Sequence, residues 1–163
     1  MDVKVQIDAA KLLQAAEKAP AATLKEMRRA LREACAAVQL TARTEHKFRA
    51  HTGALERALT YRVEQMKLEG IVFIDESVAK YGKYVHEPTG LFGPGHAKYP
   101  ITPKHKKALR WTKNGEFVYF KRVMHPGSPE DRFLYKAVER NRARIDEIFE
   151  RRTQAALEAA GLA

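Results

Sequence analysis

Two stretches of the chain repeat apolar residues every three or four positions, the spacing that places them on one face of an α-helix. In the first stretch Thr23 is a candidate N-cap, and the helix is expected to extend to around Phe48. In the second stretch a helix is expected to begin near Pro129 and to extend close to Leu157. The positions expected to be buried are Leu24, Met27, Leu31, Ala34, Val38 and Ala42 in the first helix, and Leu134, Val138, Ile145, Ile148, Phe149 and Ala156 in the second.

The segments between these helices carry strand and turn patterns. Residues 3–7 alternate between apolar and polar and predict a short edge strand, followed by an Ala/Leu-rich helix over 9–18 that Pro20 interrupts. Thr52 and Gly53 predict one short helical turn.

Residues 59–68 and 71–75 predict two strands around a turn at Glu69-Gly70. In the first run Tyr61, Val63 and Gln65 alternate with Thr60, Arg62 and Glu64, and the second run is rich in Ile, Val and Phe. The segment 77–87 is expected to form a short helix. Its expected common face consists of Val78, Tyr81 and Val85.

The clearest local signal is Asn114-Gly115 between two runs of alternating residues, which predicts a β-hairpin with a two-residue turn. In that register Lys113 lies opposite Glu116, and Trp111 lies opposite Val118. Alternating aromatic and basic residues suit a platform for single-stranded nucleic acid. They also suit a half-buried hairpin with aromatic residues inward and Lys/Arg outward, and this second interpretation is favoured.

The order of elements predicts an α+β fold, with an antiparallel sheet and β-hairpins packed by a long N-terminal helix and a long C-terminal helix. The length of 163 residues corresponds to a single domain, residues 1–163. Within it, residues 88–103 form a long loop rich in Gly and Pro, and residues 129–160 form a helical C-terminal tail. A loop of that length without secondary structure usually reaches a partner.

The chain is basic, and its positive charge is concentrated in one segment. The formal net charge is +10, and residues 96–125 carry eight Lys/Arg against one acidic residue, Glu116. Such a patch favours a polyanion such as DNA, or an acidic protein surface, while a solvated basic hairpin explains the charge equally well. The basic residues of the patch are Lys98, Lys104, Lys106, Lys107, Arg110, Lys113, Lys121 and Arg122.

The N-terminus lacks a signal-peptide pattern, no apolar run is long enough to span a bilayer, and Cys35 is the single cysteine. These features predict a soluble protein made in the cytoplasm, with no disulfide and no cysteine-based zinc site.

Catalytic and metal-binding patterns are weak. The six histidines form no HxH or HExxH pair, and although His86 and His96 flank the Gly-rich loop, exposed loop histidines are the favoured interpretation. Asp75 and Glu76 follow a strand and suit either catalysis or capping. The sequence MHPGSPEDRF at 124–133 brings a histidine, a serine and an aspartate together, but a turn at Pro126-Gly127 and an N-cap at Ser128 explain it without chemistry. No catalytic, cofactor or metal site is therefore expected.

Four segments in order give a family resemblance that covers roughly residues 20–150. They are HTGALERALTYRV at 51–63, YGKYVHEPTGLFGPG at 81–95, ITPKHKKALRW at 101–111 and FVYFKRVMHPGSPEDRFLYKAVER at 117–140. Together they resemble the tail-completion or head–tail joining proteins of long-tailed bacteriophages and prophages. One departure is Pro88, which stands where the family pattern prefers glycine. The matching residues are Thr52, Gly53, Leu55, Tyr81, Tyr84, Val85, His86, Ile101, Pro103, Lys104, Ala108, Leu109, Trp111, Val123, His125, Pro126, Gly127, Phe133, Leu134 and Ala137.

The resemblance implies a structural virion protein of the phage neck, assembled in the host cytoplasm, without catalysis, cofactor or membrane association. Such subunits form homo-oligomeric rings, commonly hexamers, between the capsid connector or adaptor and the tail tube or tail terminator. The basic patch would then face passing genomic DNA or a protein partner. The long loop would contact neighbouring subunits through Glu87, Pro88, Leu91, Phe92 and Tyr99.

Two other functions remain open on sequence. The first is a small basic nucleic-acid-binding protein that uses the 98–122 hairpin. The second is an enzyme with His86 or His125 in its site.

Overall fold

The computed structural model describes residues 2–4, 19–48, 52–64 and 66–161. It has the expected α+β fold, in which long helices accompany antiparallel sheets. The chain divides into two compact units, one made of residues 1–83 and 132–163 and the other of residues 84–131. We call them the helical unit and the hairpin unit, and describe each by itself.

Helix α2 (Pro20–Thr44) is the central element of the helical unit. It begins at Pro20, a residue that suits the first helical position. The N–H groups of the first turn have no partner within the helix, so the N–H that proline lacks is not missed there. Thr23 is therefore not the N-cap: it lies inside the first turn, is buried, and donates its hydroxyl to the carbonyl of Ala19 (3.0 Å). The expected apolar positions are buried, with the exception of Leu24, which is 38% exposed.

Helix α2 packs on a three-stranded antiparallel sheet of strands β1 (Asp2–Lys4), β2 (Leu59–Glu64) and β3 (Glu69–Ile74), in the order β1-β3-β2. The edge strand β1 was expected. The predicted turn at Glu69-Gly70 is wrong, because both residues lie in β3 and the turn is at 66–68.

Gly70 serves instead for close packing of α2 on the sheet. A Cβ atom at Gly70 would lie 2.5 Å from the Sγ atom of Cys35 on α2. Glycine at this position therefore allows a close approach of helix and strand.

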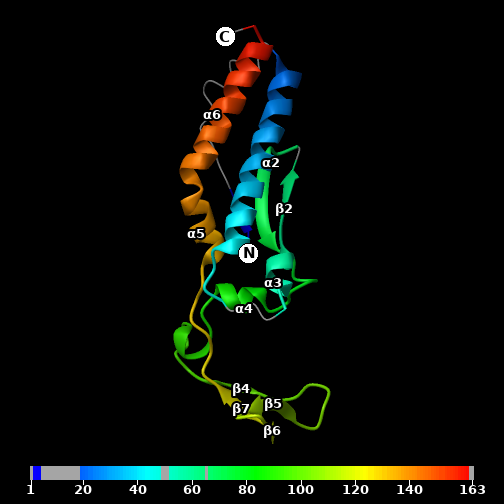
Figure 1. The fold of residues 1–163 in the computed structure, drawn as a ribbon, viewed down its shortest axis with the longest axis vertical. Coiled ribbons are helices and arrows are strands. Elements are labelled where there is room, and N and C mark those ends of the chain that lie inside the picture. Colours follow the sequence, from blue (N-terminus) through cyan, green and yellow to red (C-terminus); the bar gives the residue numbers. More distant parts are fainter. Residues whose placement is uncertain (1, 5–18, 49–51, 65, 162–163) are drawn as a thin grey trace. The chain divides into compact units, whose positions relative to one another are not determined.

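The predicted C-terminal helix is two helices, α5 (Phe133–Arg140) and α6 (Arg142–Ala159), with Asn141 between them. The Asn141 side chain donates to the carbonyl of Ala137 and to the hydroxyl of Thr41 on α2, each at 2.8 Å. Both helices pack along α2, as Figure 1 shows. The expected apolar positions are buried, apart from Val138, which is half-buried.

Two short helices complete this part of the chain. The short helix α3 (Ala54–Ala58) forms where the sequence predicts a helical turn, but its N-cap is Gly53, with φ +65°, and not the expected Thr52. The Thr52 hydroxyl accepts the Ala54 N–H (3.4 Å) instead. Helix α4 spans Gly82–His86. It begins later than expected, and its predicted apolar face is absent because Val78 and Tyr81 precede the helix and are about half exposed.

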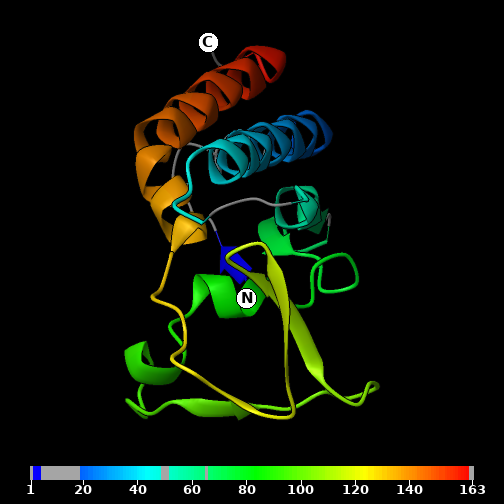
Figure 2. The ribbon, with the colours of Figure 1, turned by 60° about the horizontal axis from the view of Figure 1, so that its bottom comes forward.

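The hairpin unit contains two two-stranded antiparallel sheets. Strand β4 (Tyr99–Ile101) pairs with β7 (Val123–His125), and β5 (Leu109–Lys113) pairs with β6 (Glu116–Phe120) (Figure 2). The segment 88–103 is thus not without structure. It holds β4 and a 3-10 turn, η1 (Gly90–Phe92).

The predicted helix over 9–18 and the end of the predicted strand 3–7 lie outside the described residues. Within the described residues, no helix combines the length and apolar character that a membrane span requires.

Candidate interaction surface

Two segments distant in sequence join at the start and end of the hairpin unit. The Thr89 N–H donates to the carbonyl of Ser128 (2.9 Å), and the Ser128 N–H donates to the Thr89 hydroxyl (3.0 Å). The Leu91 N–H donates to the carbonyl of Pro126 (2.8 Å). We call residues 89–91 with 126–128 the clasp, because these bonds hold together the two ends of the segment that carries all four strands of the unit.

The clasp requires glycine on both sides. Gly90 has φ +61° and Gly127 has φ +93°, values that favour glycine over other residues. A Cβ atom on Gly127 would lie 2.0 Å from the carbonyl oxygen of Thr89, and one on Gly90 would lie 2.4 Å from that of Pro126. The two backbones therefore touch directly, with no space for a side chain between them.

The clasp corrects the predicted helix start. Ser128 is not an N-cap, because its backbone is bonded to Thr89 and α5 begins only at Phe133, without a side-chain cap. The Nδ1 atom of His125 accepts the N–H of Gly127 (3.0 Å), and the buried Asp131 donates its N–H to the carbonyl of Val85 (3.2 Å). The three residues that suggested a nucleophile site thus serve the local backbone.

The β5–β6 hairpin has the predicted register. Trp111 lies opposite Val118 and Lys113 lies opposite Glu116. Asn114 has φ +52° and Gly115 has φ +88°, which is the primed turn that an Asn-Gly pair favours.

The prediction that the aromatic residues of the hairpin point inward is wrong. Phe117 and Tyr119 are 59% and 61% exposed on one face of the hairpin, and Trp111 and Phe120 are 39% and 48% exposed on the other. The Trp111 and Phe120 rings stack at 5.1 Å, and the Arg110 guanidinium lies 4.6 Å from the centre of the Phe117 ring. Trp111 and Phe120 thus contact each other, Phe117 contacts one cation, and both faces of the hairpin display aromatic side chains.

The eight basic residues of the 96–125 segment are all exposed, but they do not form one cluster. Lys98 adjoins the end of the β4–β7 sheet where Tyr99 pairs with His125. Arg110 is engaged with Phe117, and Lys113 lies opposite Glu116 at the hairpin tip.

The remaining five basic residues lie on two connections between the same two sheets. Residues 102–108 lead from the end of β4 to the start of β5, and residues 121–122 lead from the end of β6 to the start of β7. Because Ile101 pairs with Val123, both connections leave the same end of the β4–β7 sheet. We call this set the basic junction; it comprises Lys104, Lys106, Lys107, Lys121 and Arg122.

The predicted inter-subunit loop is only partly exposed. Leu91 is 40% exposed, Phe92 53% and Tyr99 38%, and the Tyr99 ring lies 5.4 Å from the ring of His125. Glu87 is exposed, whereas Pro88 is half-buried. Leu91 and Tyr99 thus belong to the clasp and to the β4–β7 sheet as well as to the surface.

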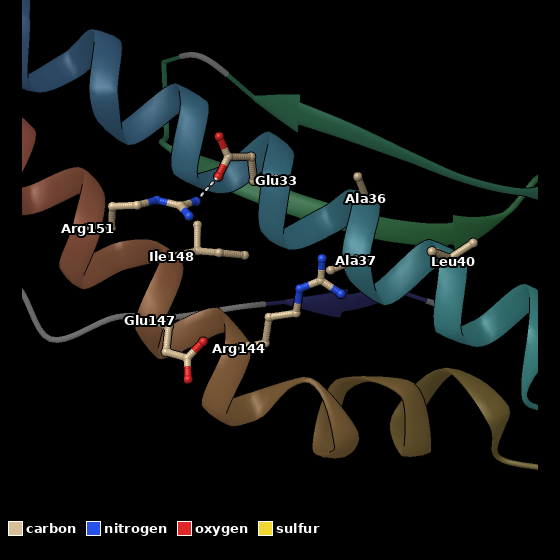
Figure 3. A pocket seen from close by; sticks show the side chains of 8 residues that line it. All are labelled: Glu33, Ala36, Ala37, Leu40, Arg144, Glu147, Ile148 and Arg151. Atoms are coloured by element: carbon tan, nitrogen blue, oxygen red, sulfur yellow. Dashed lines mark hydrogen bonds and ion pairs between the residues drawn. The ribbon is translucent and has the colours of Figure 1, made fainter.

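A pocket of about 470 Å³ lies between α2 and α6 in the helical unit (Figure 3). Ala37 of α2 and Ile148 of α6 lie between the two helices there, and the small alanine side chain leaves space beside Ile148. An ion pair between Glu33 and Arg151 (2.6 Å) lies at its edge. It contains no histidine, cysteine or hydroxyl group to perform chemistry.

Cys35 and Asp75, two residues considered for chemistry, have surroundings that explain them without catalysis. Burial raises the pKa of the Cys35 thiol to about 11, so the thiol is a poor nucleophile at neutral pH. Hydrogen bonds from the Ser77 hydroxyl and N–H lower the pKa of Asp75, which makes Asp75 a turn cap.

The loop histidines differ in their exposure. His86 is buried, contrary to expectation, and His96 is exposed and donates from Nδ1 to the carbonyl of Leu91 (3.1 Å). Among the described residues, no group of three or more His, Cys, Asp or Glu side chains is placed to hold a metal ion.

No family model, no curated protein and no solved structure matches this chain. The candidate surface therefore rests on its own geometry: an exposed aromatic hairpin, with the basic junction at its base and the clasp at the ends of the unit. The basic patch and the hairpin were visible in the sequence. The clasp was not, although the two Gly-containing pairs Thr89-Gly90 and Pro126-Gly127 were its signal.

Proposed function

We propose that this chain is a structural subunit of a tailed bacteriophage or prophage, which forms a ring that joins the capsid connector to the tail tube. The β5–β6 hairpin would be its docking element. The observation that carries the proposal is the exposure of four aromatic side chains, Trp111, Phe117, Tyr119 and Phe120, on the two faces of an isolated two-stranded sheet.

The physical argument concerns what such a hairpin needs. A two-stranded hairpin is marginally stable in water unless further strands or a packed surface cover it. Large apolar side chains gathered on a protein surface mark an interaction site. The hairpin exposes them on both faces, so a neighbouring protein surface that covers the hairpin would remove them from water.

The proposed ring requires a contact between two different surfaces of the chain. Hairpin-to-hairpin pairing of two copies would be two-fold and would close at a dimer. A contact between the hairpin of one copy and a different face of the next copy is heterologous, and such contacts form a ring when the rotation between copies closes. The resemblance of the four segments to head–tail joining proteins agrees with this assembly.

The first test is the assembly state of the purified chain, by mass photometry and negative-stain microscopy, alone and with tail tubes of the phage that encodes it. We expect annular particles for the native chain. The double variant Phe117→Ser with Tyr119→Ser should weaken assembly roughly 30-fold or more, because truncating even one hot-spot aromatic at an interface costs about 2 kcal/mol or more.

A matched control removes two exposed apolar side chains from the helical unit, through Leu24→Ser with Tyr81→Ser. This control should assemble like the native chain. A chain that stays monomeric at all concentrations and binds no part of the virion would contradict the proposal.

A further inference from the structure

The basic junction has no counter-charge among the described residues. No ion pair or hydrogen bond joins any of its five side chains to another described residue, and all five are exposed. By contrast, the helical unit neutralises several of its arginines through Glu26, Glu33 and Glu45. The positive charge of the junction is therefore open to an external partner.

A second copy of the chain offers little to neutralise it. The hairpin unit carries eight Lys/Arg against four Asp/Glu, and the rest of the chain carries 22 against 16. Both units thus repel the junction on balance. The net charge of the chain therefore favours a molecule other than this chain as the source of the complementary charge.

We propose that the basic junction binds the phosphate backbone of nucleic acid. Four of its five residues are lysines, which act as flexible point charges and need no fixed partner geometry. A backbone with one phosphate charge about every 1.7 Å of duplex meets such cations in any register, because the charges repeat along the whole polymer. An acidic protein patch offers only a limited number of carboxylates, whereas the backbone repeats its charge along its whole length.

The surroundings of the junction agree with this partner. Residues 121–122 directly follow Phe120, and the aromatic residues of the hairpin are exposed beside a segment with a single acid, Glu116. Exposed aromatic rings next to cations are the arrangement on which the bases of a single strand stack. The inference does not depend on the proposed function, because the five cations of the basic junction are not among the aromatic residues proposed to dock on a neighbouring copy.

The test is fluorescence anisotropy of labelled duplex and single-stranded oligonucleotides titrated with the intact chain at several salt concentrations. Five phosphate contacts predict a slope of about −4.5 in log K against log salt for duplex, which is roughly a 500-fold loss of affinity from about 50 to about 200 mM salt. The triple variant Lys104→Gln, Lys106→Gln and Lys107→Gln should make this slope shallower by about 2.7. If single strands bind more tightly than duplex, the hairpin aromatics stack on the bases in addition to the phosphate contacts. If duplex binds more tightly, the basic junction contacts the phosphate backbone alone.

A control of equal charge change uses three exposed cations of the helical unit, through Lys25→Gln, Lys80→Gln and Arg142→Gln. It should bind DNA with nearly the native slope. The emission of Trp111, the single tryptophan, reports in each variant whether the hairpin keeps its structure. Equal slopes for the two triple variants would overturn the proposal, as would competition by polyglutamate as strong as that by DNA at the same charge concentration.

Discussion

At the scale of single residues, two glycines allow the close approach of chain segments that are distant in sequence. Gly127 in the clasp and Gly70 against Cys35 both stand where another chain segment occupies the position of a Cβ atom. The sequence suggested turns at both places. The fold shows why glycine is required there: residues far away in the chain lie too close to leave room for a side chain.

The substitution Gly127→Ala should destabilise the hairpin unit by about 2 kcal/mol or more, because the new methyl group would overlap the Thr89 carbonyl at a positive φ. The measurement is thermal unfolding followed by Trp111 emission. Gly95→Ala is the control, since no atom lies within 4 Å of its Cβ position. Similar unfolding midpoints for the two variants would contradict the direct backbone contact between Gly127 and Thr89.

The buried thiol gives a second prediction at this scale. Because burial raises the pKa of Cys35 from its ordinary 9.0 to about 11, the native chain should react slowly with a thiol reagent such as DTNB at pH 8.5. In denaturant the same thiol should react at the rate of a free cysteine. The raised pKa also means that stability falls as pH rises from about 9 to about 11, where only the unfolded chain releases this proton readily. Rapid reaction of the native chain would contradict the packing of α2 on β3.

At the scale of elements, the patterns with local causes were predictable. The Asn-Gly turn set the hairpin register because its geometry is local. The apolar stripes predicted most of the buried positions of α2, α5 and α6, although not the break between α5 and α6 at Asn141. The clasp was not predictable, since the Ser128 cap signal was overridden by hydrogen bonds to Thr89, 39 residues away. The exposure of the hairpin aromatics also escaped prediction, because alternation does not reveal whether a covering layer exists.

The pairing of α2 with α6 depends on an ionic cluster. Arg152 of α6 bonds both Glu33 and the buried Glu26 of α2, whereas Arg151 bonds only Glu33. Burial raises the pKa of Glu33, but its hydrogen bonds and charge interactions with Arg152 and Arg151 outweigh this and lower the pKa below its ordinary value.

We therefore expect Arg152→Met to lower the thermal midpoint more than Arg151→Met does, because Glu26 then keeps only Arg29 as a partner. Since the Glu33 pKa is lowered in the folded chain, its contribution is present above the ordinary pKa of 4.5 and is lost as pH falls below it. Calorimetry of both variants at pH 7 and pH 3 tests this. Equal midpoints at pH 7 would mean that the cluster adds nothing to the pairing.

At the scale of the whole molecule, the chain combines a packed helical unit with a hairpin unit that exposes large aromatic side chains, and the five cations of its basic junction form no ion pair with another described residue. Two sheets of two strands each give the hairpin unit little core, so its aromatics and cations are available for other molecules. An assembly subunit whose docking hairpin is covered only in the ring accounts for this division. The basic junction, placed beside the hairpin, would then contact nucleic acid separately from the protein interface.

The most direct test of the docking hairpin is acrylamide quenching of Trp111 in separated monomer and assembled fractions of the native chain. Trp111 is the single tryptophan and is 39% exposed in the isolated chain, so its emission reports on this hairpin alone. If the hairpin docks in the ring, quenching should fall several-fold in the assembled fraction. Equal quenching in the two fractions would place the hairpin outside the interface and contradict the account.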